Sequence, residues 1–84
     1  HDRKYHMHIQ ILGSGCTRCI KLEQLLRERA ASMRPDAVIE KVTDVMQMLR
    51  LGIMSTPSIL IDGTPVAIGR VPSREEIDVW LARK

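Results

Sequence analysis

Cys16 and Cys19 are the only cysteines in the 84-residue chain, and their type and spacing point most directly to chemistry. They end the stretch 13–19, which reads GSGCTRC and follows an apolar segment. Residues three apart on a helix are neighbours, with β-carbons about 5–6 Å apart. The pair is therefore able to close into a disulfide with little movement of the backbone.

The cysteine pair is expected at the start of a helix, where unsatisfied N–H groups and the helix dipole favour an anion. A thiolate is such an anion, and Arg18 adds a full positive charge between the two cysteines. Cysteines in Cys-x-x-Cys motifs at helix starts can have pKa values lowered to about 3.5–7.5. We therefore predict that Cys16, the outer residue, is the attacking thiolate and that Cys19, one turn further in, is the buried resolving thiol.

Three other interpretations of the pair stay open, one of which is a non-enzymatic interaction domain that senses redox state through the two cysteines. The cysteines could be inert buried thiols, or they could bind a soft metal ion such as Cu(I) or Zn. Heavy-metal chaperones also place a glycine-rich Cys-x-x-Cys loop after their first strand, although they lack the Thr-Pro described below and end on a strand. Tetrahedral zinc would need His6 and His8 as further ligands, at a spacing that is not a common zinc motif.

Three methionines, Met46, Met48 and Met54, would suit a copper-binding or promiscuous surface. Methionine more often fills gaps in a hydrophobic core, and that is the role that we predict for them.

The cysteines lie between elements that would position them. Residues 8–12 (HIQIL) predict a strand. After the cysteines, apolar residues recur at the spacing of one helix face, at Leu22, Leu25, Leu26, Ala30 and Met33. Residues 37–43 predict a second strand, which completes a βαβ unit with two parallel strands.

The next segment predicts a short second helix. Asp44 and Gln47 resemble a capping box at its start, and Gly52 would end it. Val45, Met48 and Leu49 would form its apolar stripe.

The last third of the chain predicts two strands and a helix. Pro57 stands directly before the apolar run 58–61, and an X-Pro bond at a tight strand entry is a candidate cis peptide. Asp62 and Gly63 predict a type I′ hairpin between this strand and a strand at 64–68, which Pro65 marks as an edge. The final helix begins with a Ser73–Glu76 capping box and turns three residues inward, Ile77, Trp80 and Leu81.

Composition narrows the range of functions. The formal net charge is +3, and one Trp and one Tyr offer few stacking surfaces, so we expect no binding to nucleic acid. We interpret residues 1–6 as the remnant of an expression tag and residues 7–84 as one domain. The sequence shows no run apolar enough to span a bilayer and no charged-then-apolar secretory leader, so we expect a cytoplasmic protein without membrane contact. In a reducing cytosol, a cysteine pair of this spacing is more often catalytic or metal-binding than structural.

Taken together, the Cys-x-x-Cys loop, Ser55-Thr56-Pro57, Asp62-Gly63 and the stretch 69–73 (GRVPS) resemble the small prokaryotic redox-active disulfide proteins of the thioredoxin and glutaredoxin fold family. The resemblance covers residue 7 to the C-terminus. It implies an α/β fold with element order β-α-β-α-β-β-α, a four-stranded mixed sheet of order 2-1-3-4, and helices on both faces.

The same resemblance implies a thiol-disulfide oxidoreductase. Pro57 would be cis and pack against the cysteines, and the backbone of Thr56 would pair with a bound polypeptide. The further substrate contacts would be Gly15, Thr17 and Arg18. The partners implied are a protein disulfide and a thiol or protein reductase as electron donor; no cofactor is implied, and we expect a monomer.

The chain departs from typical members in three ways. Gly15 stands where an aromatic residue precedes the first cysteine, and Thr17-Arg18 replaces the Gly-Pro or Pro-Tyr between the cysteines. The first strand has Gln10 but no buried acid to assist the second cysteine. The redox potential of the family therefore does not carry over to this chain.

Overall fold

A computed structural model describes residues 6–13 and 15–83. The elements follow in the order β-α-β-α-β-β-α, as the sequence predicts. They are β1 (His8–Leu12), α1 (Thr17–Met33), β2 (Val38–Val42), α2 (Val45–Arg50), β3 (Ser58–Ile61), β4 (Thr64–Ile68) and α3 (Arg74–Leu81).

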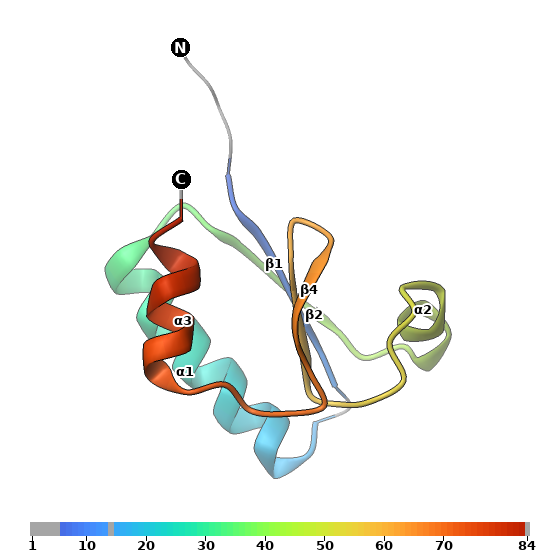
Figure 1. The fold of residues 1–84 in the computed structure, drawn as a ribbon. Coiled ribbons are helices and arrows are strands. Elements are labelled where there is room, and N and C mark those ends of the chain that lie inside the picture. The colour runs from blue at the N-terminus through green and yellow to red at the C-terminus, as the bar shows by residue number, and fades with distance from the viewer. Residues whose placement is uncertain (1–5, 14, 84) are drawn as a thin grey trace.

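The four strands form one mixed sheet in the order β2-β1-β3-β4, which confirms the predicted topology. β1 and β2 are parallel, whereas β3 is antiparallel to both β1 and β4. Figure 1 shows α1 and α3 together on one face of the sheet and α2 on the other face. The sheet is therefore covered on both sides, but by helices of very different length.

Successive side chains along each strand point to opposite faces of the sheet, so the core consists of two clusters, one on each face. The larger cluster joins the sheet to α1 and α3 and includes Ile9, Ile11, Leu22, Leu26, Ile59, Ile77, Trp80 and Leu81. The inward stripes predicted for these two helices are confirmed, except that Met33, at the end of α1, is exposed. The smaller cluster lies under α2 and contains Leu12, Val42, Met48, Ile53 and Leu60.

α2 differs from its prediction. The Asp44 side chain caps the helix by accepting the Met46 N–H at 3.1 Å, and the C-cap is Leu51 rather than the following Gly52. Met48 is buried, but Val45 and Leu49 are 62% and 46% exposed, so the predicted apolar stripe is wrong at two of its three positions. A helix of six residues has too little length to bury a full face against the sheet.

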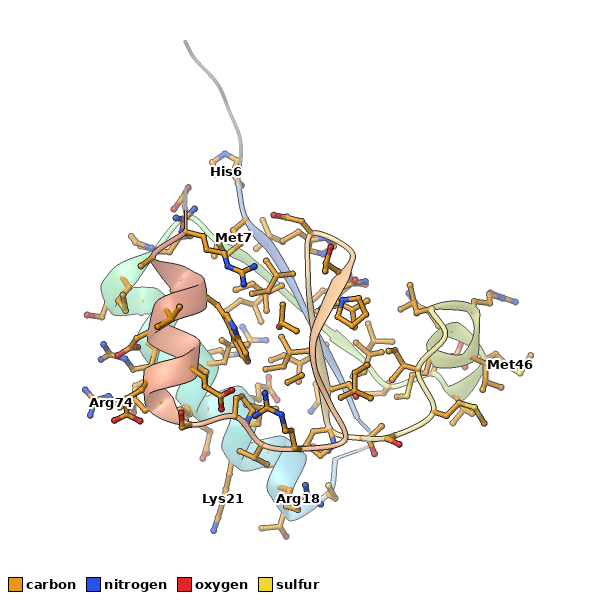
Figure 2. The ribbon with its side chains drawn as sticks, viewed as in Figure 1. His6, Met7, Arg18, Lys21, Met46 and Arg74 are labelled. Atoms are coloured by element: carbon orange, nitrogen blue, oxygen red, sulfur yellow. The ribbon has the colours of Figure 1, made fainter. Side chains whose placement is uncertain are left out.

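The predicted core role of the methionines is likewise correct only for Met48. Met46 is 57% exposed and points outward from α2 (Figure 2), and Met54 is 86% exposed. Both side chains lie at the surface because the helix and the segment that follows it extend beyond the edge of the small cluster.

The turn and cap signals of the last third are confirmed. Asp62 and Gly63 both have positive φ, 51° and 83°, as a type I′ turn requires. β4 is an edge strand that contains Pro65. Ser73 and Glu76 form a reciprocal capping box, with bonds of 3.1 and 3.0 Å.

Most of the segment interpreted as tag remnant, residues 1–5, lies outside the described residues, so that interpretation stays a prediction. In the described part of the chain, no helix is both long and apolar enough to cross a membrane.

Candidate active site

The two cysteines occupy the first turn of α1. Cys16 is the N-cap residue, the non-helical residue at the start, and its sulfur accepts the backbone N–H of Cys19 at 3.4 Å. The two sulfurs lie 2.9 Å apart as thiols. Cys16 is exposed, whereas Cys19 is only 2% exposed. Cys16 is therefore open to solvent, and the Cys19 sulfur is buried beside it.

The surroundings of Cys16 lower the pKa of its thiol. The largest cause is the hydrogen bond from the Cys19 side chain, followed by the bond from the Cys19 N–H. Partial burial opposes this shift, and the Arg18 backbone N–H adds a smaller stabilisation of the thiolate. The charge of Arg18 makes the smallest contribution, because its side chain is exposed at the tip of α1 (Figure 2). The sequence prediction of an ionised Cys16 therefore has a different main cause from the one expected.

Gly13 provides the space for the inner cysteine. It is buried directly after β1, and its N–H donates to the Val42 carbonyl at 3.0 Å. A β-carbon at this position would lie 3.2 Å from the Cys19 Cβ and would overlap the Cys19 sulfur. Sequence reasoning missed this role, although a glycine that ends a strand three residues before the first cysteine is a signal of close approach.

The Thr56–Pro57 segment lies at the same end of the sheet as the cysteines. Leu12, the last residue of β1, pairs with Ser58, the first residue of β3. Gly13, which follows Leu12, and Pro57, which precedes Ser58, therefore lie next to this same residue pair at the end of the sheet. The Thr56–Pro57 peptide bond is cis. Pro57 is buried and Thr56 is exposed. The register thus brings together two loops that are about forty residues apart in the chain.

The flanking residues predicted to contact a substrate are on the same surface. Gly15, Thr17 and Arg18 are all exposed around Cys16. Gly15 has a φ of +86°, a conformation that residues with a side chain rarely adopt. An aromatic side chain, common in the family before the first cysteine, would be strained in this backbone conformation.

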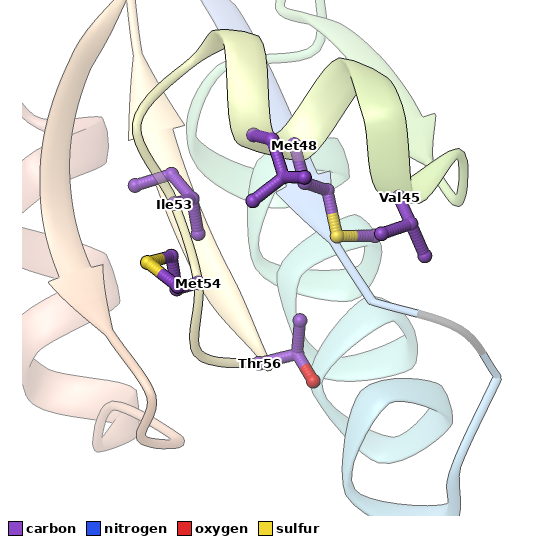
Figure 3. A pocket seen from close by; sticks show the side chains of 6 residues that line it. Val45, Met48, Ile53, Met54 and Thr56 are labelled. Carbon is purple, nitrogen blue, oxygen red and sulfur yellow. The ribbon is translucent and has the colours of Figure 1, made fainter.

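An apolar pocket adjoins Thr56. Its volume is about 220 Å³, and Figure 3 shows side chains from α2 and from the segment before β3 that face it. The lining residues are Val45, Met48, Leu49, Ile53, Met54 and Thr56. Sequence reasoning did not predict this pocket, because it assigned the apolar residues of α2 to the core.

The structure does not bring the histidines to the cysteines. His8 starts β1, about 13 Å from Leu12 at the other end of the strand. Its Nε2 lies 3.0 Å from a Glu40 carboxylate oxygen, and His6 lies 3.2 Å from Asp36. Within residues 6–13 and 15–83, no three His, Cys, Asp or Glu side chains gather as metal ligands would. His6 and His8 therefore do not complete a zinc site with the two cysteines in this structure.

A sheet of order 2-1-3-4 with a dithiol at the start of the helix after β1 defines a thioredoxin fold with a redox-type cysteine pair. Residues 7–82 match the family model described as a thioredoxin domain. The chain is 41% identical over 76 residues to the thioredoxin of Methanothermobacter thermautotrophicus, covering 90% of this chain and 99% of that protein. It is 35% identical over 69 residues to the thioredoxin of Methanocaldococcus jannaschii, covering 82% and 79%.

The chain therefore belongs to the thioredoxin family. It is a small thioredoxin-like thiol-disulfide oxidoreductase.

Proposed function

We propose that this protein reduces disulfides in partner proteins, with Cys16 as nucleophile and Cys19 as resolving residue. The Cys16 thiolate attacks one sulfur of the partner disulfide, forms a mixed disulfide and expels the other partner sulfur as a thiolate. Cys19 then attacks the Cys16 sulfur and releases the second partner sulfur. Two electrons pass to the partner, and the protein is left with a Cys16–Cys19 disulfide, which a small thiol or a protein reductase reduces again.

One observation carries this proposal: the exposed thiol of Cys16, whose pKa is lowered, lies 2.9 Å from the buried sulfur of Cys19. A thiolate is the attacking species in disulfide exchange, so the lowered pKa favours the first step at Cys16. The burial of Cys19 protects it from outside disulfides until Cys16 is occupied. The short distance between the sulfurs then favours the intramolecular second step.

Cys19 must lose its thiol proton during the second step. Gln10 of β1 does not replace the missing acid, because its side chain donates to Glu40 at 3.3 Å. We propose that water or the thiolate expelled from the partner accepts the proton. Either acceptor is available at an open site once the first thiolate has left.

Several exposed groups support a protein partner. The N–H and C=O of Thr56 have no hydrogen-bond partner among the described residues, so they are available to an extended chain that adds beside them. The adjoining pocket presents apolar side chains of Val45, Leu49 and Met54. Apolar side chains exposed in this way offer contacts for apolar residues on either side of the cysteine in a partner chain. Arg18 would favour an acidic residue near the partner cysteine.

We further propose that the protein acts as a monomer in a reducing compartment such as the cytoplasm. A disulfide between Cys16 and Cys19 closes a very short loop, so it would stabilise the fold little through chain entropy. A cysteine pair of this kind is better suited to cycling than to a structural role.

A trapping experiment tests the proposed order of attack. Cys19→Ser should accumulate a mixed disulfide through Cys16 with proteins from a cell extract, and dithiothreitol should release them. Cys16→Ser is the matched control and should trap nothing. The wild type should catalyse the reduction of insulin by dithiothreitol, and both variants should be inactive.

Two results would contradict the proposal. One is preferential trapping through Cys19 in the Cys16→Ser variant. The other is stoichiometric binding of Cu(I) or Zn by the reduced wild type together with no insulin reduction, which would favour the metal-chaperone alternative.

A further inference from the structure

Ser58 is a buried polar residue in a position that the redox chemistry does not use. It follows Pro57 directly, begins β3 and has no exposed surface. Among the described residues, Ser58 has the only polar side chain that is buried. A buried hydroxyl is costly unless it is hydrogen-bonded, so its partners indicate why it is there.

The Ser58 hydroxyl joins two backbone segments. It donates to the Ser55 carbonyl at 2.6 Å and accepts the Gly69 N–H at 3.1 Å. Ser55 precedes Thr56, and Gly69 follows the last residue of β4. One side chain therefore ties the loop before β3 to the end of the neighbouring strand.

Gly69 holds the same loop by close packing. A β-carbon on Gly69 would lie 2.9 Å from the Ser55 Cβ, which is closer than such atoms approach each other. Gly69 also has a φ of +70°, where a side chain would be strained. The glycine thus lets the end of β4 lie directly against Ser55, and the Ser58 bonds fix that contact. We call Ser58, Gly69 and Ser55 the loop clamp.

The loop clamp encloses Thr56 on both sides along the chain. Ser55 is fixed by the clamp, and Pro57 and Ser58 are buried. Thr56 lies between them and is exposed, as Ser55 is, and its N–H and C=O make no hydrogen bond within the described structure. A backbone held in this way does not have to be ordered when a partner chain pairs with it, and such preorganisation improves affinity.

We infer that Ser58 is a positioning residue that, through the loop clamp, holds the Thr56 backbone for pairing with the partner protein. The inference rests on the proposed function, because it concerns the binding surface of that same site. Ser58 is not catalytic, since its hydroxyl bonds backbone groups and not the sulfurs. Its loss should therefore weaken the binding of protein disulfides and leave the chemistry of Cys16 unchanged.

The test compares three serine variants. Ser58→Ala removes the hydroxyl, and Ser58→Thr keeps it. Ser73→Ala is the control, because it removes a hydroxyl that caps α3 by accepting the Glu76 N–H at 3.1 Å and that makes no bond with the loop clamp. For each we would measure kcat and KM for insulin reduction, the rate with a small aromatic disulfide, and the pH dependence of Cys16 alkylation.

Ser58→Ala should raise KM for insulin about five- to tenfold, with kcat, the small-disulfide rate and the alkylation midpoint nearly unchanged. Ser58→Thr should recover most of the wild-type KM, and Ser73→Ala should have the wild-type KM at temperatures where it is folded. An unchanged KM in folded Ser58→Ala would overturn the inference. So would an equal loss in the small-disulfide rate, or an equal rise of KM in Ser73→Ala.

A measurement on the wild type keeps the inference testable if Ser58→Ala does not fold. The Gly69 amide should exchange its hydrogen at least tenfold more slowly than the amide of exposed Met54, because it donates to the buried hydroxyl. Equal exchange rates would show that the loop clamp does not form. Failure of the proposed function is recognised separately, because wild-type protein would then reduce no insulin at all.

Discussion

The sulfur of Cys16 accepts the backbone N–H of Cys19 at 3.4 Å and lies 2.9 Å from the sulfur of the same residue. Cys19 therefore contacts the sulfur of Cys16, the proposed nucleophile, through both its main chain and its side chain. The residue proposed to resolve the mixed disulfide is also the one that most lowers the pKa of the attacking thiol. Substitution of Cys19 should consequently change the first chemical step as well as the second.

Cys19→Ala should raise the pH midpoint for alkylation of Cys16 by iodoacetamide, because it removes the largest cause of the lowered pKa. Cys19→Ser keeps a donor at that position and should show a midpoint between those of the wild type and Cys19→Ala. Arg18→Ala should shift the midpoint less than Cys19→Ala, since the guanidinium charge is the smallest contribution. A larger shift in Arg18→Ala would mean that the charge, and not the sulfur pair, controls Cys16.

Gly13→Ala should displace the Cys19 thiol, because the added methyl group would overlap it. Overpacking of this kind costs about 1–3 kcal/mol of unfolding free energy, which urea denaturation would measure. The mixed disulfide formed at Cys16 should also persist longer than in the wild type, because its resolving sulfur is misplaced. Rapid resolution and unchanged stability would show that the cysteine loop adjusts freely around Gly13.

Met54→Lys should reduce kcat/KM for insulin about fivefold, because a charge would be placed at the mouth of the apolar pocket. A methionine that a bound partner covers in part contributes about 1 kcal/mol to binding, which is close to a fivefold change in affinity. Val79→Lys is the matched control, since Val79 is 66% exposed on α3, on the other face of the sheet. Similar losses in both variants would point to a general effect of charge and not to the pocket.

Acid should destabilise the protein partly through Glu76. Its pKa is lowered from 4.5 to about 2, first by the Arg70 side chain and then by the Ser73 N–H. The unfolded chain then binds a proton more readily than the folded one, so this contribution is present above about pH 4.5 and is lost as the pH falls toward 2.

Glu76→Gln keeps an amide for the capping box but removes the charge that Arg70 stabilises. The unfolding free energy of this variant should therefore fall less steeply between pH 4.5 and 2 than that of the wild type. Arg70→Gln should likewise reduce the fall in unfolding free energy over this pH range, because it removes the guanidinium that pairs with Glu76. If the unfolding free energy of both variants falls with pH as steeply as that of the wild type, the acid sensitivity comes from other carboxylates.

Elements with strong local signals could be predicted from the sequence. The helical spacing from Leu22 onward and the Ser73–Glu76 capping box placed α1 and α3, and Asp62-Gly63 placed the hairpin. The thioredoxin-like resemblance supplied the strand order, because strand pairing depends on contacts between residues distant in the chain. The structure provides that pairing through registers such as Leu12 with Ser58.

The features that sequence reasoning missed depend on three-dimensional proximity. The apolar residues of α2 read as a core stripe, but whether they are buried depends on how far the helix reaches over the sheet. The roles of Gly13 and Ser58 arise from a sulfur and two backbone groups that approach them in space. A glycine directly after a strand, as at Gly13, indicates a close approach but not which atom approaches, and the sequence around Ser58 holds no comparable signal.

The small size of α2 has a consequence for the range of partners. Its one buried side chain, Met48, anchors a six-residue helix, whereas α1 is anchored by four buried side chains over 17 residues. The wall of the pocket that α2 supplies is thus less firmly attached than the frame that carries the sulfurs. We therefore expect partner proteins of different shape to displace α2 more easily than α1, so that the pocket adapts to a partner without moving the helix that carries the two sulfurs.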